Sequence, residues 1–182
     1  MDKNELIKEL AWSGIKSELG VSNLITKYDV VKEYPEFVNA GATFITLKKD
    51  GNLRGCIGSL VAQNELYNDL VINARKAAFK DPRFKPVSKE ELSDISLEVS
   101  ILTPAVLVKY DNIEDLKSKI TVGVDGVILK LENNQGTFLP QVWDDLPTFE
   151  LFFEHLCKKA RLEGGCLEKH PQIYKYQVEK IK

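Results

Sequence analysis

The chain has 182 residues, of which 43% are hydrophobic and 29% charged, and its net charge is −2 with 25 basic and 27 acidic residues. This length and hydrophobic content suit one domain, with room for a smaller lobe, and argue against disorder. The charge balance lacks the basic excess of a nucleic-acid-binding protein, and no segment has the roughly 20 apolar residues of a membrane helix.

The N-terminal segment predicts an amphipathic helix rather than a signal peptide. Asp2 and Glu5 have the spacing of a capping box, with Asp in the Ser/Thr role, and apolar residues then recur at helical intervals. Charged residues interrupt the apolar run that a signal peptide needs. The three cysteines, at positions 56, 157 and 166, are too few and too scattered for a disulfide framework, so we expect a reducing, cytoplasmic environment.

After a loop over residues 27–37, two β-rich segments flank the dipeptide Asp50-Gly51. Asp-Gly is typical of a type I′ hairpin turn, because both central positions need a positive φ. A regular hairpin from this turn pairs residue 49 with 52, 47 with 54, 45 with 56 and 43 with 58. Since residues two apart share a face of a strand, we expect Arg54 and Cys56 to point the same way.

The rest of the chain mixes strands and helices without a strict βαβ rhythm, which favours the α+β class. A helix with Asn64 as its N-cap ends at "DPRFKP", because the residue before a proline leaves the α region. The segment "ISLEVSIL" alternates apolar and polar residues as a half-buried strand does. Two short strands around "ENNQG", an amphipathic helix over residues 147–160 and a last strand "IYKYQVE" complete the prediction.

Cys56 in "LRGCIG" has two interpretations. In the functional one, the Arg54 guanidinium lowers the pKa of the thiol and favours the reactive thiolate, while Gly55 and Gly58 allow a ligand to approach closely. In the structural one, Cys56 faces Ile45 in a strand that is apolar on both sides, and it packs as a small hydrophobic residue. We favour the structural interpretation.

Arg54 needs a partner on such an apolar face, because burying an unpaired charge is costly. The candidates are Glu98, on the polar side of "ISLEVSIL", and Asp81, in "DPRF". The arginine either forms an internal ion pair or presents its rigid donor fork to an anion at a cleft, and the sequence does not decide between the two. In the "DPRF" turn we expect Asp81 to cap or pair locally and Arg83 to face the same cleft as Cys56.

The remaining reactive side chains give weaker signals. His155 and His170 lack the partners of a zinc-binding motif, and no C-x-x-C pair occurs, so we expect no metal site. The motifs "GCIG" and "GVDG" do not match a phosphate-binding loop, and we expect no cofactor. A Cys–His dyad of Cys56 with either histidine stays open, because the sequence does not give its geometry.

Several segments in a fixed order identify a family resemblance: "LRGCIGSL", "AAFKDPRFKPVSKEEL", "ISLEVSIL", "GVDGVIL" and "TFLPQVWDDLPTFELFFEHLCKKA". The chain resembles the AMMECR domain family, and it is most similar to the bacterial and archaeal branch called AmmeMemoRadiSam system protein A. The resemblance covers nearly the whole chain. The combination of "LRGCIG", "DPRF" and "FLPQVW" at these distances is highly specific.

The resemblance implies a single domain over residues 1–182 with an α+β fold. It implies a mostly antiparallel β-sheet flanked by α-helices, and a smaller lobe with a cleft between. It also implies partners, a Memo-like protein and a radical-SAM protein encoded nearby, but no known reaction. The family's functional element is taken to be "LRGCIG", which here consists of Leu53, Arg54, Gly55, Cys56, Ile57 and Gly58.

Two positions depart from the pattern that the resemblance implies. Asp125 stands in "GVDG" where relatives are expected to carry a histidine, and Arg161 stands in "KKARL" where a glycine is expected. If that histidine acts in catalysis elsewhere, this chain lacks it. Cys56 then has still fewer candidate bases.

The leading hypothesis is an accessory role, in which one face binds a ligand or the system partners. The residues of this face are those of "LRGCIG" together with Asp81, Arg83 and Phe84. The alternative is an enzyme in which Cys56 is the nucleophile or redox thiol, Arg54 activates it and Glu98 acts as base or orienter. We expect no membrane association and no nucleic-acid partner.

Overall fold

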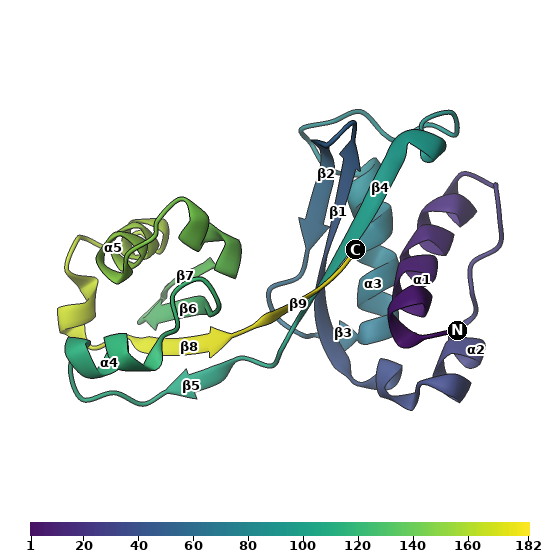
Figure 1. Ribbon diagram of the computed structural model, residues 1–182. Helices are drawn as coiled ribbons and strands as arrows, with labels where there is room; N and C mark the ends of the chain where they lie inside the picture. The colour runs from purple at the N-terminus through teal and green to yellow at the C-terminus, as the bar shows by residue number, and fades with distance from the viewer. The chain divides into compact units, whose positions relative to one another are not determined.

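The computed structural model describes residues 1–182 as two compact units, each with its own β-sheet (Figure 1). Unit 1 comprises Met1–Leu102 and Glu179–Lys182, and unit 2 comprises Thr103–Val178. Both sheets are built from antiparallel strand pairs and both units contain helices, so the expected α+β class is confirmed. No helix has both the length and the apolar character needed to cross a membrane.

The helices of unit 1 are α1 (Lys3–Glu18), α2 (Lys27–Glu33), η1 (Pro35–Val38), α3 (Leu66–Phe79) and η2 (Leu92–Asp94), where η denotes a 3-10 helix. The capping box of Asp2 and Glu5 begins α1 as predicted. The segment 27–37, predicted as a loop, is helical instead, because the Thr26 side chain caps α2. The predicted N-cap Asn64 is also wrong, since it pairs with Gly41 in a short strand that precedes α3.

The sheet of unit 1 has five strands in the order β2–β1–β4–β9, with β3 paired to β1. They are β1 (Ala40–Lys49), β2 (Asn52–Gly58), β3 (Asn64–Glu65), β4 (Ile95–Leu102) and β9 (Val178–Ile181). Figure 1 shows α1 and α3 side by side on one face of this sheet. Their apolar stripes pack there against Ile45, Leu47 and Val99, all buried, and this contact forms the core of the unit.

The hairpin of β1 and β2 forms at the predicted turn, but its register is not the regular one. Asp50 and Gly51 have φ angles of 51° and 76°, as a type I′ turn requires. Residue 49 pairs with 52 as expected, and a β-bulge then inserts Arg54 as an extra residue. Beyond the bulge, residue 47 pairs with 55, 46 with 56, 45 with 57 and 44 with 58. The three other predicted pairs are therefore wrong, including the one that placed Cys56 opposite an apolar residue.

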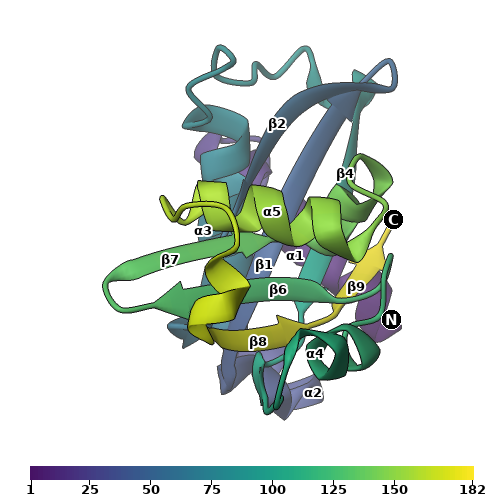
Figure 2. The ribbon, with the colours of Figure 1, turned by 90° about the vertical axis from the view of Figure 1, so that its left-hand side faces the viewer.

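Unit 2 contains a four-stranded sheet in the order β5–β8–β6–β7. Its elements are β5 (Val106–Val108), α4 (Ile113–Lys119), β6 (Gly126–Leu131), β7 (Asn134–Phe138), η3 (Pro140–Asp144), α5 (Phe149–Lys159), η4 (Cys166–Lys169) and β8 (Gln172–Tyr176). Figure 2 shows α5 lying across β6 and β7. Gly136 allows this close packing, because a Cβ there would lie 3.0 Å from the amide nitrogen of Ala160. The core behind α5 includes Trp143 stacked on Phe152, with ring centroids 3.6 Å apart.

The segment "IYKYQVE", predicted as one strand, is divided between the two sheets. Residues 172–176 form β8 of unit 2 and residues 178–181 form β9, which pairs with β4. The break is at Gln177, whose amide donates to the Thr103 hydroxyl at 2.8 Å and whose carbonyl accepts from the Thr103 amide at 2.9 Å. Thr103 and Gln177 thus tie together the two connections through which the chain enters and leaves unit 2.

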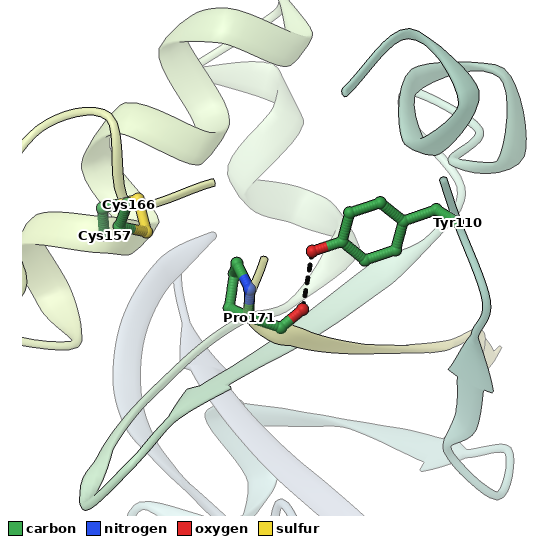
Figure 3. Close-up of a disulfide and its surroundings, with 4 residues drawn as sticks. All are labelled: Tyr110, Cys157, Cys166 and Pro171. Atoms are coloured by element: carbon green, nitrogen blue, oxygen red, sulfur yellow. Dashed lines mark hydrogen bonds between the residues drawn. A yellow bond between two sulfur atoms is a disulfide. The ribbon is translucent and has the colours of Figure 1, made fainter. Parts of the chain in front are cut away.

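Cys157, near the end of α5, and Cys166, at the start of η4, form a disulfide (Figure 3). The cysteines were expected to be too few and too scattered for a disulfide framework, and this single bond was not predicted. The chain reverses between them through Gly165, whose φ of 77° lies in the left-handed region, and this brings the two α-carbons to 5.9 Å. After η4, the Tyr110 hydroxyl donates a 2.6 Å hydrogen bond to the carbonyl of Pro171 and fixes the start of β8 (Figure 3).

Arg161 occupies the position where the family resemblance implies a glycine, and its backbone explains the preference. Helix α5 ends in a Schellman motif, in which the amide of Leu162 donates to the carbonyl of Cys157 and the amide of Arg161 to that of Lys158. Arg161 has a φ of 59°, in the left-handed region that disfavours residues with a Cβ. The chain therefore forms the cap with a residue that strains it.

Candidate functional site

The face of the unit 1 sheet opposite α1 and α3 carries the cysteine, and we call it the Cys56 face. Its residues on β1, β2 and β4 are Phe44, Thr46, Lys48, Leu53, Cys56, Gly58, Ser96, Glu98 and Ser100. Gly55 points to the other face, because a Cβ there would clash with the carbonyl oxygen of Ala77 in α3. The two-residue alternation therefore holds after the bulge and places Cys56 away from the helices.

The bulge removes the basis for expecting Arg54 and Cys56 to share a face. In a β-bulge two successive residues lie opposite one residue of the partner strand, and here Arg54 and Gly55 lie opposite Leu47. The Arg54 guanidinium is bound by Glu91, whereas the Cys56 thiol lies 3.4 Å from the Thr46 hydroxyl. The two side chains thus have separate partners, and the regular register from which a shared face was predicted does not form.

Cys56 is half-buried, and it is the one cysteine outside the disulfide. Its cross-strand neighbour is Thr46 rather than the predicted Ile45, and the Thr46 hydroxyl can donate a hydrogen bond to the sulfur or accept one from it. The structural interpretation assumed a thiol packed against apolar side chains on both strands. The thiol instead faces a hydroxyl on the polar side of the sheet, so that premise is wrong.

The backbone of Cys56 is held by the "DPRF" turn at the free edge of β2. Its amide donates to Asp81 Oδ2 at 2.9 Å, and its carbonyl accepts from Arg83 Nη2 at 3.2 Å. Asp81 and Arg83 also pair with each other, Nε with Oδ1 at 2.9 Å and Nη2 with Oδ2 at 2.7 Å. The local pairing predicted for Asp81 is confirmed, and Arg83 contacts the cysteine strand. This ion pair bonds the backbone groups that a further strand would otherwise use.

The Asp81–Arg83 pair combines a buried carboxylate with an exposed guanidinium. Hydrogen bonds from Arg83, assisted by the amide of Cys56, hold the pKa of Asp81 well below its usual range, although burial acts in the opposite direction. The carboxylate in turn raises the pKa of Arg83, and Cys56 makes a smaller Coulombic contribution in the same direction. Arg83, rather than Arg54, is therefore the arginine that contacts the Cys56 residue.

Arg54 is paired with Glu91, which the sequence did not single out. Its Nε and Nη2 donate to the two carboxylate oxygens at 3.0 Å each, so both predicted partners, Glu98 and Asp81, are wrong. The Arg54 hydrogen bonds lower the pKa of Glu91 to about 2. Glu91 comes ten residues after Asp81 in the sequence, and only the tertiary structure places it against the bulge.

Glu98 shares the Cys56 face but does not contact the cysteine. Thr46 pairs with Cys56 on one side and with Glu98 on the other, so the strand β1 separates them. Two strand spacings are roughly 10 Å, which is beyond hydrogen-bond reach. The closest charged partner of Glu98 is Lys182, at 3.9 Å. The role of base or orienter predicted for Glu98 has no direct contact to support it.

A buried polar cluster behind the motif strand was missed by the sequence analysis. The carboxylate of Asp69 accepts hydrogen bonds from the Thr43 hydroxyl at 2.7 Å, from Ser59 at 2.6 Å and from Asn73 at 2.9 Å. Asp69 and Asn73 are each 2% exposed and lie four residues apart on the apolar stripe of α3. Polar residues on the buried face of a helix indicate a buried hydrogen-bond network. The network around Asp69 joins α3 to Ser59, directly after β2.

The remaining candidates lie in unit 2 and have local partners. His155 contacts the carbonyl of Leu151 in its own helix, and His170 stacks on Tyr110 with ring centroids 4.3 Å apart. Asp125, where a histidine was expected, is buried and accepts from the amide of Thr121 at 2.8 Å. It therefore closes the turn before β6. No group of three His, Cys, Asp or Glu side chains has the arrangement of a metal site.

Comparison with known proteins places these residues in a family. The chain is 36% identical over 184 residues to a protein of Methanothermobacter thermautotrophicus, with 98% of this chain and 93% of that protein covered. It is 39% identical over 165 residues to Protein MJ0810 of Methanocaldococcus jannaschii, with 86% and 80% covered. The crystal structure of the uncharacterized protein PH0010 from Pyrococcus horikoshii superposes with a TM-score of 0.78 at 32% identity, covering 97% of this chain and 89% of that one. The AMMECR1 family model matches residues 8–181, and the chain therefore belongs to the AMMECR1 family.

Proposed function

We propose that this chain is a cytoplasmic accessory component that binds a partner protein or ligand through β2 and the "DPRF" turn. Its partners are Memo-like and radical-SAM proteins, the ones that the family resemblance implies. The observation that carries the proposal is the bonding around Cys56. Its backbone is clamped by Asp81 and Arg83, and its thiol faces Thr46 rather than a base.

Rigidity at this strand supports binding more than chemistry. A nucleophilic cysteine needs a base within hydrogen-bond reach, and neither a carboxylate nor an imidazole bonds to Sγ. The glycines of the motif have packing roles, since a Cβ at Gly55 would clash with α3 and one at Gly58 would clash with the Phe44 ring. The motif therefore builds a strand of fixed shape, and a fixed surface lowers the entropic cost of binding.

Partner binding can be tested with two matched substitutions of exposed apolar residues. Leu53 lies on the Cys56 face and is 43% exposed, whereas Ile72 lies on α3 and is 40% exposed. Leu53→Glu should weaken binding to the purified Memo-like or radical-SAM protein at least about tenfold in biolayer interferometry, a loss of about 1.4 kcal/mol. Ile72→Glu should leave binding within about twofold. Equal binding by both variants, or no binding by the wild type, would reject the proposal.

The alternative function is an enzyme with Cys56 as nucleophile, and the observation in its favour is that Arg83 Nη2 bonds to the Cys56 carbonyl at 3.2 Å and so brings a positive charge next to this residue. Because the other cysteines are joined, iodoacetamide labelling without reductant reports on Cys56 alone. Slow labelling at pH 7, unchanged in Arg83→Gln, agrees with the accessory role. Fast labelling that Arg83→Gln slows at least about fivefold would favour the enzyme and contradict our proposal.

A further inference from the structure

Arg54 has a hydrogen-bond donor that the fold leaves unused. Its Nη1 is the one buried side-chain nitrogen or oxygen in the chain without a hydrogen-bond partner. Its other edge, Nε and Nη2, is fully engaged by the two oxygens of Glu91. Buried donors are almost always satisfied, so a single exception in the motif strand requires an explanation.

Arg83 is arranged in the same way on the same aromatic ring. Its Nε and Nη2 bond to Asp81, and its Nη1 makes no hydrogen bond within the protein. The guanidinium carbons of Arg54 and Arg83 lie 6.0 Å and 5.5 Å from the centroid of the Phe84 ring. In both arginines, therefore, a carboxylate binds one edge of the guanidinium and Nη1 has no partner, and both guanidiniums lie near the Phe84 ring.

The surrounding loop has an excess of positive charge. Residues 80–91, which connect α3 to η2, contain four basic residues and three acids, Asp81, Glu90 and Glu91. The side chains of Lys80, Lys85 and Lys89 are exposed and form no salt bridge. Because the charges of Arg54 and Glu91 cancel, the electrostatic potential near Phe84 depends mainly on the lysines of this loop, and a positive potential favours an anion.

We propose that the Arg54 and Arg83 guanidiniums, both next to the Phe84 ring, bind an oxyanion, namely the carboxylate or phosphate group of a small ligand or of a partner. Nη1 of Arg83 is reached directly, since that side chain is 54% exposed. Nη1 of Arg54 is buried near the half-buried Phe84 ring, so an anion reaches it only when side chains there move. Glu91 and Asp81 hold the guanidinium planes in place, as fixed supporting groups do in preorganised anion sites.

This site deepens the proposed function, on which it rests, because it assigns a ligand class to the same strand and turn. The bulge takes Arg54 out of the cross-strand pairing of β2, and the arginine pairs with Glu91, at the end of the basic loop, rather than with Glu98 of β4.

The site can be tested by titrating the full chain with inorganic phosphate and, separately, with succinate at constant ionic strength. Binding is read from the amide shifts of residues 54–58, 81 and 83–85 in ¹⁵N NMR spectra. We expect saturable shifts with one or both anions, and saturation by only one identifies the oxyanion as phosphate or carboxylate. Arg83→Gln should weaken binding at least about tenfold, the loss expected for one charge-assisted hydrogen bond.

Arg75→Gln is the matched control, because Arg75 is a half-exposed arginine of α3 that also pairs with a carboxylate, Glu18. Its affinity for the anion should stay within about twofold of the wild type. Arg54→Gln is a second variant that should also weaken anion binding. Its result counts only if its circular dichroism spectrum matches that of the wild type; if the spectrum differs, the result for Arg83→Gln alone decides. Shifts that do not saturate, or equal losses in Arg75→Gln and Arg83→Gln, would overturn the inference. Anion binding without partner binding rejects the proposed partners only, and partner binding without anion binding rejects this site only.

Discussion

Breaking the disulfide between Cys157 and Cys166 should destabilise unit 2 by about 2.7 kcal/mol. The cysteines are nine positions apart, so the bond closes a loop of ten residues. The chain-entropy relation gives about 9 cal/mol/K for a loop of this length, which is about 2.7 kcal/mol at 25 °C. Both cysteines are 2% exposed, so the bond also lies within the packed core.

The assay needs a probe that reports on unit 2 alone. Trp143 is 2% exposed and stacks on Phe152, so its fluorescence should change when this unit unfolds. Trp12 lies in α1 of unit 1, and Trp12→Phe leaves Trp143 as the single tryptophan. In that background, urea unfolding of the Cys157→Ala, Cys166→Ala double variant is compared with the oxidised protein.

The reduced wild type separates loss of the bond from loss of the side chains. It should lose nearly as much stability as the double variant, because the entropic term depends on the bond and not on the sulfur atoms. A difference below about 0.5 kcal/mol between the oxidised and reduced proteins would refute the reasoning. Mass spectrometry showing three free thiols in protein purified without reductant would refute the bond itself.

Three further predictions concern the backbone and the ion pairs. Arg161→Gly should raise the unfolding free energy by about 1 kcal/mol in urea, because it relieves a left-handed residue in the cap of α5. Gly55→Ala should cost about 3 kcal/mol or more by a clash with α3, whereas Gly51→Ala, which meets no atom within 4 Å, should cost about 1 kcal/mol for its positive φ. Because the folded pKa of Glu91 is lowered from 4.5 to about 2, its pairing with Arg54 stabilises the protein fully above pH 4.5 and is lost as the pH falls toward 2. The destabilisation caused by Glu91→Gln, roughly 1–3 kcal/mol in urea at pH 6, should therefore shrink by pH 3.

The sequence predicts well the elements that local chemistry decides. Asp2 and Glu5 begin α1 as a capping box, and Asp50-Gly51 form the hairpin turn, because both depend on residues within one turn of the chain. The bulge at Arg54 depends instead on packing against α3, which the hairpin sequence does not contain. A one-residue shift of register changes every cross-strand neighbour beyond it, and the predicted surroundings of Cys56 were wrong for this reason.

The candidate site was predicted in its parts but not in its connections. "LRGCIG" and "DPRF" do meet, and Asp81 pairs with Arg83 two residues away, as a proline turn allows. The partner of Arg54 could not be chosen from sequence, because several carboxylates are compatible and only tertiary structure selects Glu91. Tertiary structure also determines how "IYKYQVE" is divided between two sheets, because a continuous β-rich segment does not indicate which sheet each part joins.

The bonding at the edge of β2 explains why these two motifs act as one structure. An edge strand exposes unpaired backbone groups, and proteins normally cover them or break the pairing with a bulge. Here both devices operate within three residues: the bulge removes Arg54 from the ladder, and Asp81 and Arg83 bond to the amide and carbonyl of Cys56. Because Asp81 serves the amide and the guanidinium at once, losing either partner leaves a buried carboxylate under-satisfied. The edge is thus closed to further strands, and a binding partner has to recognise side chains there rather than add to the sheet.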